Sequence, residues 1–405
     1  MDKNLLDTPK IQLAFSHVKD AFSPLHEDSK NAHLGIIVKS SSTQERRGLQ
    51  SITENEKNPA FFRVERFILQ SAVRHLFPKS TTAKCLRALC PNCSDVKVFQ
   101  SINFGTTHYV NLQICSSVWS CPVCSIKISE RRRLEVQSAM QQHESSGGQV
   151  LLLTLTNPHY TTDFLPNLLK RQALAMSRFK GNRSAKKLFA SVDCIGSIRA
   201  WEVTHSDKNG WHPHFHLLLF VRSGLDLEEL QNCFYKVWAN CCRLAKLPIP
   251  SLAHGVRLDD GSKAAEYVSK GTWGLDSEMT KGHIKKGVNG GLSPFDLLRL
   301  YAYNDDKCAG ALFCEYAKAF KGNGQLVWSP GLKALFAIND KSDKQVASSI
   351  DEHSILLGSI ELKQWRLVLR FDSLLNSRSE ILERARDGWE RVERYLIYLE
   401  NLAAN

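Results

Sequence analysis

Long apolar segments are missing from this sequence. No run approaches the roughly 18 consecutive apolar residues that a helix needs to cross a bilayer. The chain starts Met-Asp-Lys-Asn-Leu-Leu, which is not the apolar core of a signal peptide. It also contains no internal repeat and no glycine-rich nucleotide-binding loop. These absences predict a cytoplasmic protein without a membrane partner, and they argue against repeat proteins and P-loop enzymes.

Acidic residues are outnumbered by basic ones. The 405 residues include 53 Lys and Arg but only 41 Asp and Glu, which gives a net charge of +12. Such an excess predicts an anionic partner, and nucleic acid is the usual one. The length predicts two or three folded units, and 43% hydrophobic residues are enough to build sizeable cores.

Residues 199–220 predict a β-hairpin. Two alternating apolar runs flank Asp-Lys-Asn-Gly, and a loop that ends in glycine is a strong hairpin signal. A three-residue loop that ends at Gly210 places Glu202 opposite His216. A two-residue turn would instead move Glu202 to the other face, because side chains alternate along a strand.

The histidines of this hairpin predict a metal site. His212, His214 and His216 alternate along one strand, so their imidazoles share a face of the sheet, and the predicted register adds the Glu202 carboxylate. A single buried histidine is usually a hydrogen-bonded core residue. Three at this spacing, with an acid in register, are typical of a divalent-cation site. The apolar run 217–221 predicts a buried strand that holds these ligands rigidly.

Six cysteines crowd into residues 85–124, where they include two C-P-x-C knuckles. Paired knuckles are typical of a structural zinc site, because each tight turn presents two thiolates to a tetrahedral ion. We predict Zn²⁺ coordination by the four knuckle cysteines, Cys90, Cys93, Cys121 and Cys124. Cys85 or Cys115 remains an alternative to one of them, and six free thiols are the other interpretation.

Basic residues cluster in two further places. One cluster lies on a predicted amphipathic helix at about 125–144, and the other lies in a glycine-rich segment. We expect these side chains to contact DNA phosphates, although the arginines could equally form a solvated helix face. The five are Arg131, Arg132, Arg133, Lys285 and Lys286.

The predicted elements follow the order β-α-β-β-α-β, from a strand at 150–156 to one at 255–259. This order predicts an α+β fold with a ferredoxin-like, or RRM-like, antiparallel sheet and helices on one face. The other face is then free for the metal site and a polynucleotide. The zinc knuckles precede this sheet, and a helical C-terminal region follows it.

A short predicted helix after the last strand carries Lys263, Tyr267 and Lys270 on one face. Two ammonium groups beside a tyrosine favour its phenolate, which is a nucleophile for phosphorus. A tyrosine packed between helix and sheet is the alternative. The position of Tyr267, one strand after the metal hairpin, favours the role of nucleophile.

Together these motifs resemble the rolling-circle replication initiators of small plasmids, in the single-tyrosine class of the HUH endonuclease superfamily. The resemblance covers about 85–340. It rests on the Leu-Thr-Leu-Thr strand, the Gly-Trp-His-Pro-His-Phe-His hairpin and the Glu-Tyr-Val-Ser-Lys helix, which occur in the family's order.

The resemblance assigns roles to the matching residues. It implies that His214 and His216 bind Mg²⁺ or Mn²⁺, with Glu202 as an acidic third ligand. Tyr267 matches the nucleophile. His212 would complete a relaxase-like histidine triad, whereas this family often uses only the pair that corresponds to His214 and His216.

One departure from the family lies beside the nucleophile. Some relatives carry a glutamate one helical turn before the tyrosine, where this chain has Lys263. Lys263 or Lys270 would instead neutralise developing charge or lower the pKa of the tyrosine.

The implied function is a site- and strand-specific nickase and ligase. It binds single-stranded or hairpin origin DNA in the bacterial cytoplasm, forms a 5′-phosphotyrosine link and frees a 3′-OH primer, with host helicase and polymerase as partners. A relaxase or rolling-circle transposase would use the same chemistry. A non-catalytic RRM-like module would show exposed aromatics where this chain has histidines.

The predicted domains follow from these motifs. They are an N-terminal arm (1–80), a Cys-rich zinc-binding module with a basic helix (81–147), the HUH endonuclease domain (148–275), a Gly/Lys loop with helices that complete the core (276–340) and a small C-terminal module (345–405).

Overall fold

The computed structural model describes residues 59–261, 291–350 and 353–404, which divide into two compact units. The first unit combines the described residues through Ser71 with Ala83–Gln113 and the chain from Ile350 onward. The second combines Ala72–Thr82 with Ile114–Ser349. This division differs from the predicted consecutive domains, because strands far apart in the sequence pair with one another.

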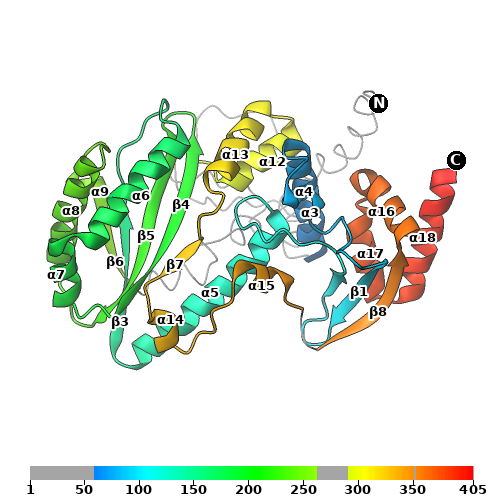
Figure 1. Cartoon of the computed structure of the whole chain (residues 1–405), viewed down its shortest axis with the longest axis horizontal. Helices are drawn as coiled ribbons and strands as arrows, with labels where there is room; N and C mark the ends of the chain where they lie inside the picture. The colour runs from blue at the N-terminus through cyan, green and yellow to red at the C-terminus, as the bar shows by residue number, and fades with distance from the viewer. Residues whose placement is uncertain (1–58, 262–290, 351–352, 405) are drawn as a thin grey trace, which may run out of the picture. The chain divides into compact units, whose positions relative to one another are not determined.

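The first unit contains a three-stranded sheet. Strand β1 (Asp95–Ser101) pairs antiparallel with β2 (Thr107–Val110) on one side and with β8 (Ser354–Glu361) on the other. Three helices follow β8 and are drawn in orange to red in Figure 1. They are α16 (Leu362–Leu375), α17 (Ser377–Arg386) and α18 (Trp389–Ala404). The predicted helical C-terminus is thus confirmed, but β8 ties it to residues near 100.

Helices and connections complete the described chain. Helix α3 (Pro59–Leu76) includes the helical segment expected at the end of the N-terminal arm, and α4 (Thr81–Lys84) follows it. Among the described residues that follow Asp260, the second unit contains four helices: α12 (Pro294–Asn304), α13 (Lys307–Ala319), α14 (Leu332–Leu335) and α15 (Asp343–Ser348). No helix among the described residues is long and apolar enough to cross a membrane.

A five-stranded antiparallel sheet forms the centre of the second unit. Its strands are β3 (Gly148–Leu155), β4 (Gly196–Ser206), β5 (Gly210–Arg222), β6 (Val256–Asp260) and β7 (Leu326–Trp328). They lie in the order β6-β3-β5-β4-β7, and every neighbouring pair is antiparallel. The predicted α+β class with an antiparallel sheet is confirmed, while β7 is an edge strand that the sequence did not reveal.

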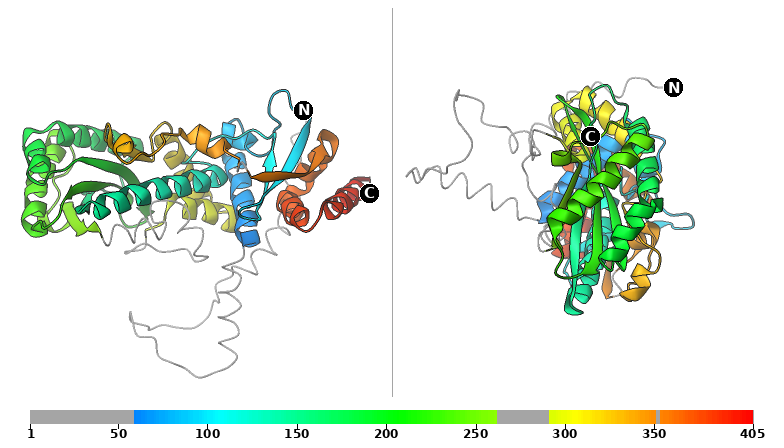
Figure 2. Two further views of the ribbon diagram at one scale, coloured as in Figure 1. Left: turned by 90° about the horizontal axis from the view of Figure 1, so that it is seen from below. Right: turned by 90° about the vertical axis from the view of Figure 1, so that its left-hand side faces the viewer.

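One face of this sheet is covered by helices that connect its strands. These helices are drawn in green in Figures 1 and 2. They are α6 (Leu165–Gly181), α7 (Arg183–Ser191), α8 (Leu227–Leu244) and α9 (Leu252–Gly255). Phe215 of β5 packs against Trp238 of α8, with ring centroids 6.3 Å apart and both side chains fully buried. The connection between α6 and α7 is a single residue, Asn182, which caps α7.

The opposite face was expected to be free, and this expectation is wrong for half of it. Helix α5 (Pro122–Ser145) lies against that face, where Ala139 and Met140 pack on Leu218 and Phe220. Apolar side chains at these positions of β5 need a cover, because exposed aliphatic area is costly. The histidines precede this apolar cluster and lie nearer the start of β5.

Gly210 allows the hairpin to turn close to the loop that follows β3. Its φ is +70°, and a Cβ atom there would lie 2.9 Å from backbone atoms of Tyr160 and Thr161. Gly224, just beyond the other end of β5, has a φ of +76°, but a Cβ atom there would meet nothing within 4 Å. The two glycines share a backbone conformation and differ in packing.

We therefore expect Gly210→Ala to destabilise the protein more than Gly224→Ala does. Each substitution costs about 1–2 kcal/mol for the left-handed conformation, and the clash at Gly210 adds about 1–3 kcal/mol. Thermal unfolding followed by tryptophan fluorescence measures the difference. Equal shifts in Tm for the two variants would contradict the close approach at Gly210.

Candidate functional site

The pairing of β4 with β5 sets the geometry of the histidine motif. Glu202 lies opposite His214, so the predicted pairing of Glu202 with His216 is wrong by two residues. The loop occupies 207–209, and Gly210 is already the first residue of β5. Because the error is an even number of residues, Glu202 remains on the face that carries the histidines.

Three donor atoms converge on this face. Glu202 Oε2 lies 2.8 Å from His216 Nε2 and 3.5 Å from His214 Nε2, and the two imidazole nitrogens are 3.1 Å apart. Ligands at neighbouring corners of an octahedral Mg²⁺ site are separated by about 3 Å. The donor set and its spacing therefore fit one divalent cation, held by His214, His216 and Glu202.

The site is buried on one side and open on the other. The side chains of His214 and His216 are 11% and 13% exposed, whereas that of Glu202 is 45% exposed. Buried imidazoles cannot easily change rotamer, and an exposed carboxylate leaves the cation approachable. A cation held by these three donors would keep coordination positions open to a further ligand, unlike one in a closed structural site.

Electrostatics keep the carboxylate ionised. Withdrawal from solvent raises the pKa of Glu202, but the charge of His214 and hydrogen bonds from both imidazoles lower it well below the usual range. Burial lowers the pKa of His214, and Glu202 outweighs this and raises it. Burial, together with the neighbouring His214 charge, lowers the pKa of His212 to about 3, so His212 is neutral at physiological pH.

His212 lies outside the three-donor group. Its ring stacks between those of His214 and His159, with centroid distances of 4.8 Å and 4.6 Å. His159 Nδ1 donates to the carbonyl of Asn209 at 2.9 Å, which ties the loop after β3 to the hairpin turn. Nothing in the sequence pointed to His159, because an isolated loop histidine has no periodic signal.

Thr154 supports the metal ligands from the neighbouring strand. It lies opposite His216 in the β3–β5 ladder, and its Oγ1 is 2.9 Å from His216 Nδ1. With Nε2 directed at a cation, the Nδ1–H of His216 donates to this oxygen and fixes the ring. The register of β3 was not predictable, so this role of Thr154 could not be read from the sequence.

A buried glutamine supports the strand at its proline. Pro213 lies on β5 beyond the end of β3, whose last partner is Phe215, so its missing N–H removes no bond to β3. The side-chain amide of Gln172, on α6, is fully buried and donates to the Pro213 carbonyl at 2.6 Å. This contact holds the strand in place between His212 and His214.

Five predicted site residues lie outside the described residues. They are Lys263, Tyr267, Lys270, Lys285 and Lys286. Strand β6 ends at Asp260, three residues before Lys263 in the sequence. The roles assigned to them therefore remain predictions.

Each arginine of the predicted DNA-binding triplet has a carboxylate partner within the second unit. The shortest contacts are Arg131–Glu135 at 3.2 Å, Arg132–Asp343 at 2.8 Å and Arg133–Glu130 at 2.6 Å. Arg132 is also only 11% exposed at its side chain. These contacts make the triplet an ion-paired helix face, and its contact with DNA phosphates remains a prediction.

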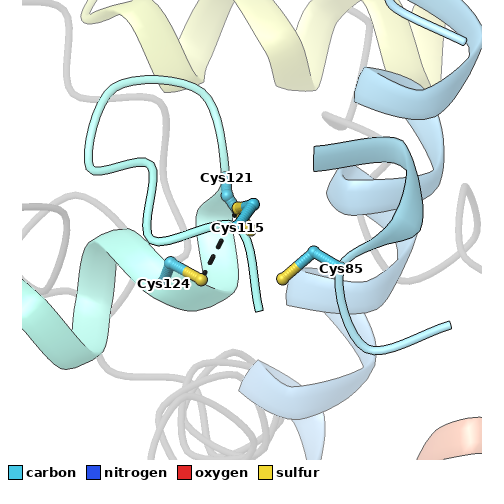
Figure 3. A group of neighbouring side chains, drawn as sticks. All are labelled: Cys85, Cys115, Cys121 and Cys124. Atoms are coloured by element: carbon cyan, nitrogen blue, oxygen red, sulfur yellow. Dashed lines mark hydrogen bonds between the residues drawn. The ribbon is translucent and has the colours of Figure 1, made fainter. Parts of the chain in front are cut away.

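The structure groups the cysteines differently from the predicted knuckle pairs. Figure 3 shows Cys115, Cys121 and Cys124 together with Cys85, and the four sulfur atoms lie within 4.8 Å of one another. The Cys115 and Cys124 sulfurs are 3.7 Å apart. A tetrahedral zinc ion with Zn–S bonds of about 2.3 Å separates its thiolates by about 3.8 Å. Four thiols at this spacing fit a structural Zn²⁺ ion.

Backbone pairing explains why Cys90 is not in this group. The amide of Leu86 donates to Gln113 O, and that of Cys90 donates to Asn111 O, so the two segments run antiparallel. This pairing carries Cys85 toward Cys115 and places Cys90 beside Asn111. The sequence showed the abundance of thiols, but not which segments pair.

The comparisons with known proteins agree with the site. Residues 108–252 match the family described as Replication protein. This part of the chain, called the Rep-type region below, is similar to replication proteins of that family. It includes Cys115 and the whole metal hairpin, but it ends before Tyr267.

The relatives extend the similarity beyond the Rep region. A protein named Protein rep from Streptomyces lividans is 26% identical over 66% of this chain and 74% of its own length. A Neomycin resistance protein from Streptomyces cyanogenus is 29% identical over 31% of this chain and 34% of its own. A Protein rep from Lentilactobacillus hilgardii is 24% identical over 39% and 50%. No solved structure matches the chain.

We expect Thr154→Val to weaken binding of Mn²⁺ about 10- to 100-fold, because His216 loses the hydrogen bond that orients its ring. Thr156→Val is the matched control, since Thr156 Oγ1 donates its hydrogen bond to the carbonyl of His254 instead of to an imidazole of the site. Isothermal titration calorimetry measures the Mn²⁺ affinity of both variants. Equal affinities for the two variants would exclude this role for Thr154.

We expect the purified protein to contain about one zinc ion per chain. Cys115→Ser should lose that zinc, whereas Cys90→Ser should retain it, because only Cys115 belongs to the thiol group. Inductively coupled plasma mass spectrometry of the purified variants measures the zinc content per chain. Zinc lost from Cys90→Ser and kept in Cys115→Ser would restore the predicted knuckle pairs.

Proposed function

We propose that this protein initiates plasmid rolling-circle replication by nicking and rejoining one strand of origin DNA. The observation that carries the proposal is the convergence of Glu202, His214 and His216 within the Rep-type region. A cytoplasmic bacterial location and cooperation with host helicase and polymerase belong to the same proposal.

The fold supports this assignment. The elements of the second unit run β3–α6–α7–β4–β5–α8–α9–β6, and the four strands lie in the order β6-β3-β5-β4. We assign this arrangement to the ferredoxin-like sheet of the HUH nucleases. Its middle strands, β3 and β5, lie side by side, which brings Thr154 to His216.

A divalent cation at this site would act as a Lewis acid on the scissile phosphate. Glu202 contributes a negative charge to the donor set, while Thr154 and the buried imidazoles keep the donors aligned. Tyr267 attacks phosphorus as its phenolate, the P–O3′ bond breaks, and the 3′ oxygen takes a proton and leaves as a hydroxyl. The products are a 5′-phosphotyrosine and a free 3′-OH, and the reverse transfer rejoins the strand.

A non-catalytic RRM-like module is less consistent with the structure. Such modules stack bases on exposed aromatic side chains of the middle strands. On β4 and β5, Trp201, Trp211 and Phe215 are each at most 8% exposed. On its other face this hairpin carries the exposed carboxylate of Glu202 and the largely buried imidazoles of His214 and His216 instead of a stacking surface.

We expect the wild-type protein to form a covalent adduct with labelled single-stranded origin DNA in Mn²⁺, and Tyr267→Phe to form none. Tyr301→Phe is the matched control and should form the adduct at the wild-type rate. Denaturing electrophoresis detects the adduct. An adduct in Tyr267→Phe would assign the nucleophile to another tyrosine.

The same assay tests the metal ligands. Replacing His214 and His216 together by alanine should slow adduct formation at least about 10²-fold, because the phosphate loses the several kcal/mol that a Lewis acid supplies. No adduct from the wild type with any origin strand or divalent metal would exclude the nuclease function.

A further inference from the structure

The C-terminal helices of the first unit contain a basic and aromatic cavity that the metal site does not use. Its volume is about 710 Å³. The residues that line it are three arginines and two tyrosines, namely Arg384, Arg391, Arg394, Tyr395 and Tyr398. Among these described lining residues none is acidic, although α17 and α18 contain several glutamates.

Helical spacing places these side chains together. Arg391, Arg394, Tyr395 and Tyr398 follow the i, i+3, i+4, i+7 pattern of one face of α18. Arg384 comes from α17, and its guanidinium lies 4.5 Å above the centre of the Tyr395 ring. The Tyr395 and Tyr398 rings are 6.0 Å apart and inclined by 25°. Cationic and aromatic groups therefore alternate around one cavity.

Buried contacts hold the cavity in shape. The Tyr395 hydroxyl lies 3.1 Å from Ser377 Oγ at the start of α17. The next residue, Arg378, is fully buried and donates to Asp372 of α16 at 2.7 Å. The wall formed by α17 and Tyr395 is thus anchored in the core of the unit, while Tyr398 is 49% exposed.

The arginines are available to an anion. Arg384 pairs with Glu380 at 3.0 Å, and Arg391 pairs with Asp387 at 3.3 Å. Both are exposed pairs one helical turn apart, and such pairs contribute little to stability, so a phosphate can replace the carboxylate. Within the described part of the chain no carboxylate lies within ion-pair distance of Arg394, which donates only to the carbonyl of Glu390.

We propose that this cavity is a second nucleic-acid site that binds single-stranded DNA. Guanidinium groups bind phosphates through two parallel hydrogen bonds, and the exposed Tyr398 ring can stack on an unpaired base. A duplex keeps its bases stacked inside and would leave Tyr398 unused. The inference rests on the proposed function, in which the protein meets a strand separated from its complement.

The experiment measures the affinity of the full-length protein for a labelled oligothymidylate by fluorescence anisotropy over a range of salt concentrations. The double variant Arg391→Gln, Arg394→Gln should bind about 10-fold more weakly. Its dependence of log affinity on log salt should be less steep by about 1.4, because two contacts to single-strand phosphates are lost. Tyr398→Leu should weaken binding of the single strand about 10-fold and leave binding of a duplex unchanged.

Arg386→Gln is the matched control. Arg386 also lies on α17 and its side chain is 54% exposed, but it does not line the cavity. Its affinity should stay within about twofold of the wild type, since only diffuse charge is lost. An equal loss in this control, or unchanged affinity in the cavity variants, overturns the inference.

The adduct assay on the wild type separates this inference from the proposed function. A wild-type adduct together with unaffected binding by the cavity variants rejects the second site alone. Weakened binding by the cavity variants without any wild-type adduct supports the DNA site and rejects the nuclease. If Tyr398→Leu weakens binding of duplex and single-stranded DNA equally, Tyr398 does not stack on unpaired bases. That result rejects the proposed preference of the cavity for single-stranded DNA.

Discussion

Glu202 and His214 lie directly opposite each other in the β4–β5 ladder, and the rest of the candidate site depends on this pairing. Cross-strand neighbours have Cβ atoms about 4.5–5.5 Å apart, so backbone hydrogen bonds alone bring the carboxylate to the imidazoles. The neighbouring strand β3 then supplies Thr154 to His216. Strands β4 and β5 supply the three donors and β3 supplies the hydroxyl that contacts one of them, so no loop is needed to assemble the group. A group held by backbone pairing in this way is rigid, which suits the metal-dependent chemistry that we propose for it.

The two faces of the same sheet explain why the site is both firm and accessible. Behind the histidines, Phe215 packs in the interface with α8, which fixes β5 against the core. On the histidine face, α5 covers Leu218 and Phe220 but not the ligand end of the strand. Apolar burial therefore anchors the end of β5 that α5 covers, while the three candidate metal ligands lie on the same face nearer the start of the hairpin strand.

Sequence patterns were reliable where one element decides the outcome. Period-two alternation placed His214 and His216 on one face, and the second helix of the predicted β-α-β-β-α-β order is the observed helix Leu227–Leu244. Patterns failed where two segments must meet. The hairpin register was wrong by two residues because Asp-Lys-Asn-Gly is compatible with more than one loop. The cysteine knuckles were paired by spacing, whereas the pairing of residues 86–90 with 111–113 brings other thiols together.

The sequence by itself determined the chemistry of this protein: an excess of cations, imidazoles at strand spacing, clustered thiols, and the order of strands and helices. Tertiary structure alone decided which of these groups meet. It placed Thr154 beside His216, stacked His159 on His212 and neutralised the arginine triplet with Glu130, Glu135 and Asp343. The physical reason is that alternation and helical periodicity are local properties of a chain. Contacts between distant segments depend on register and packing, which many sequences of the same pattern could satisfy in different ways.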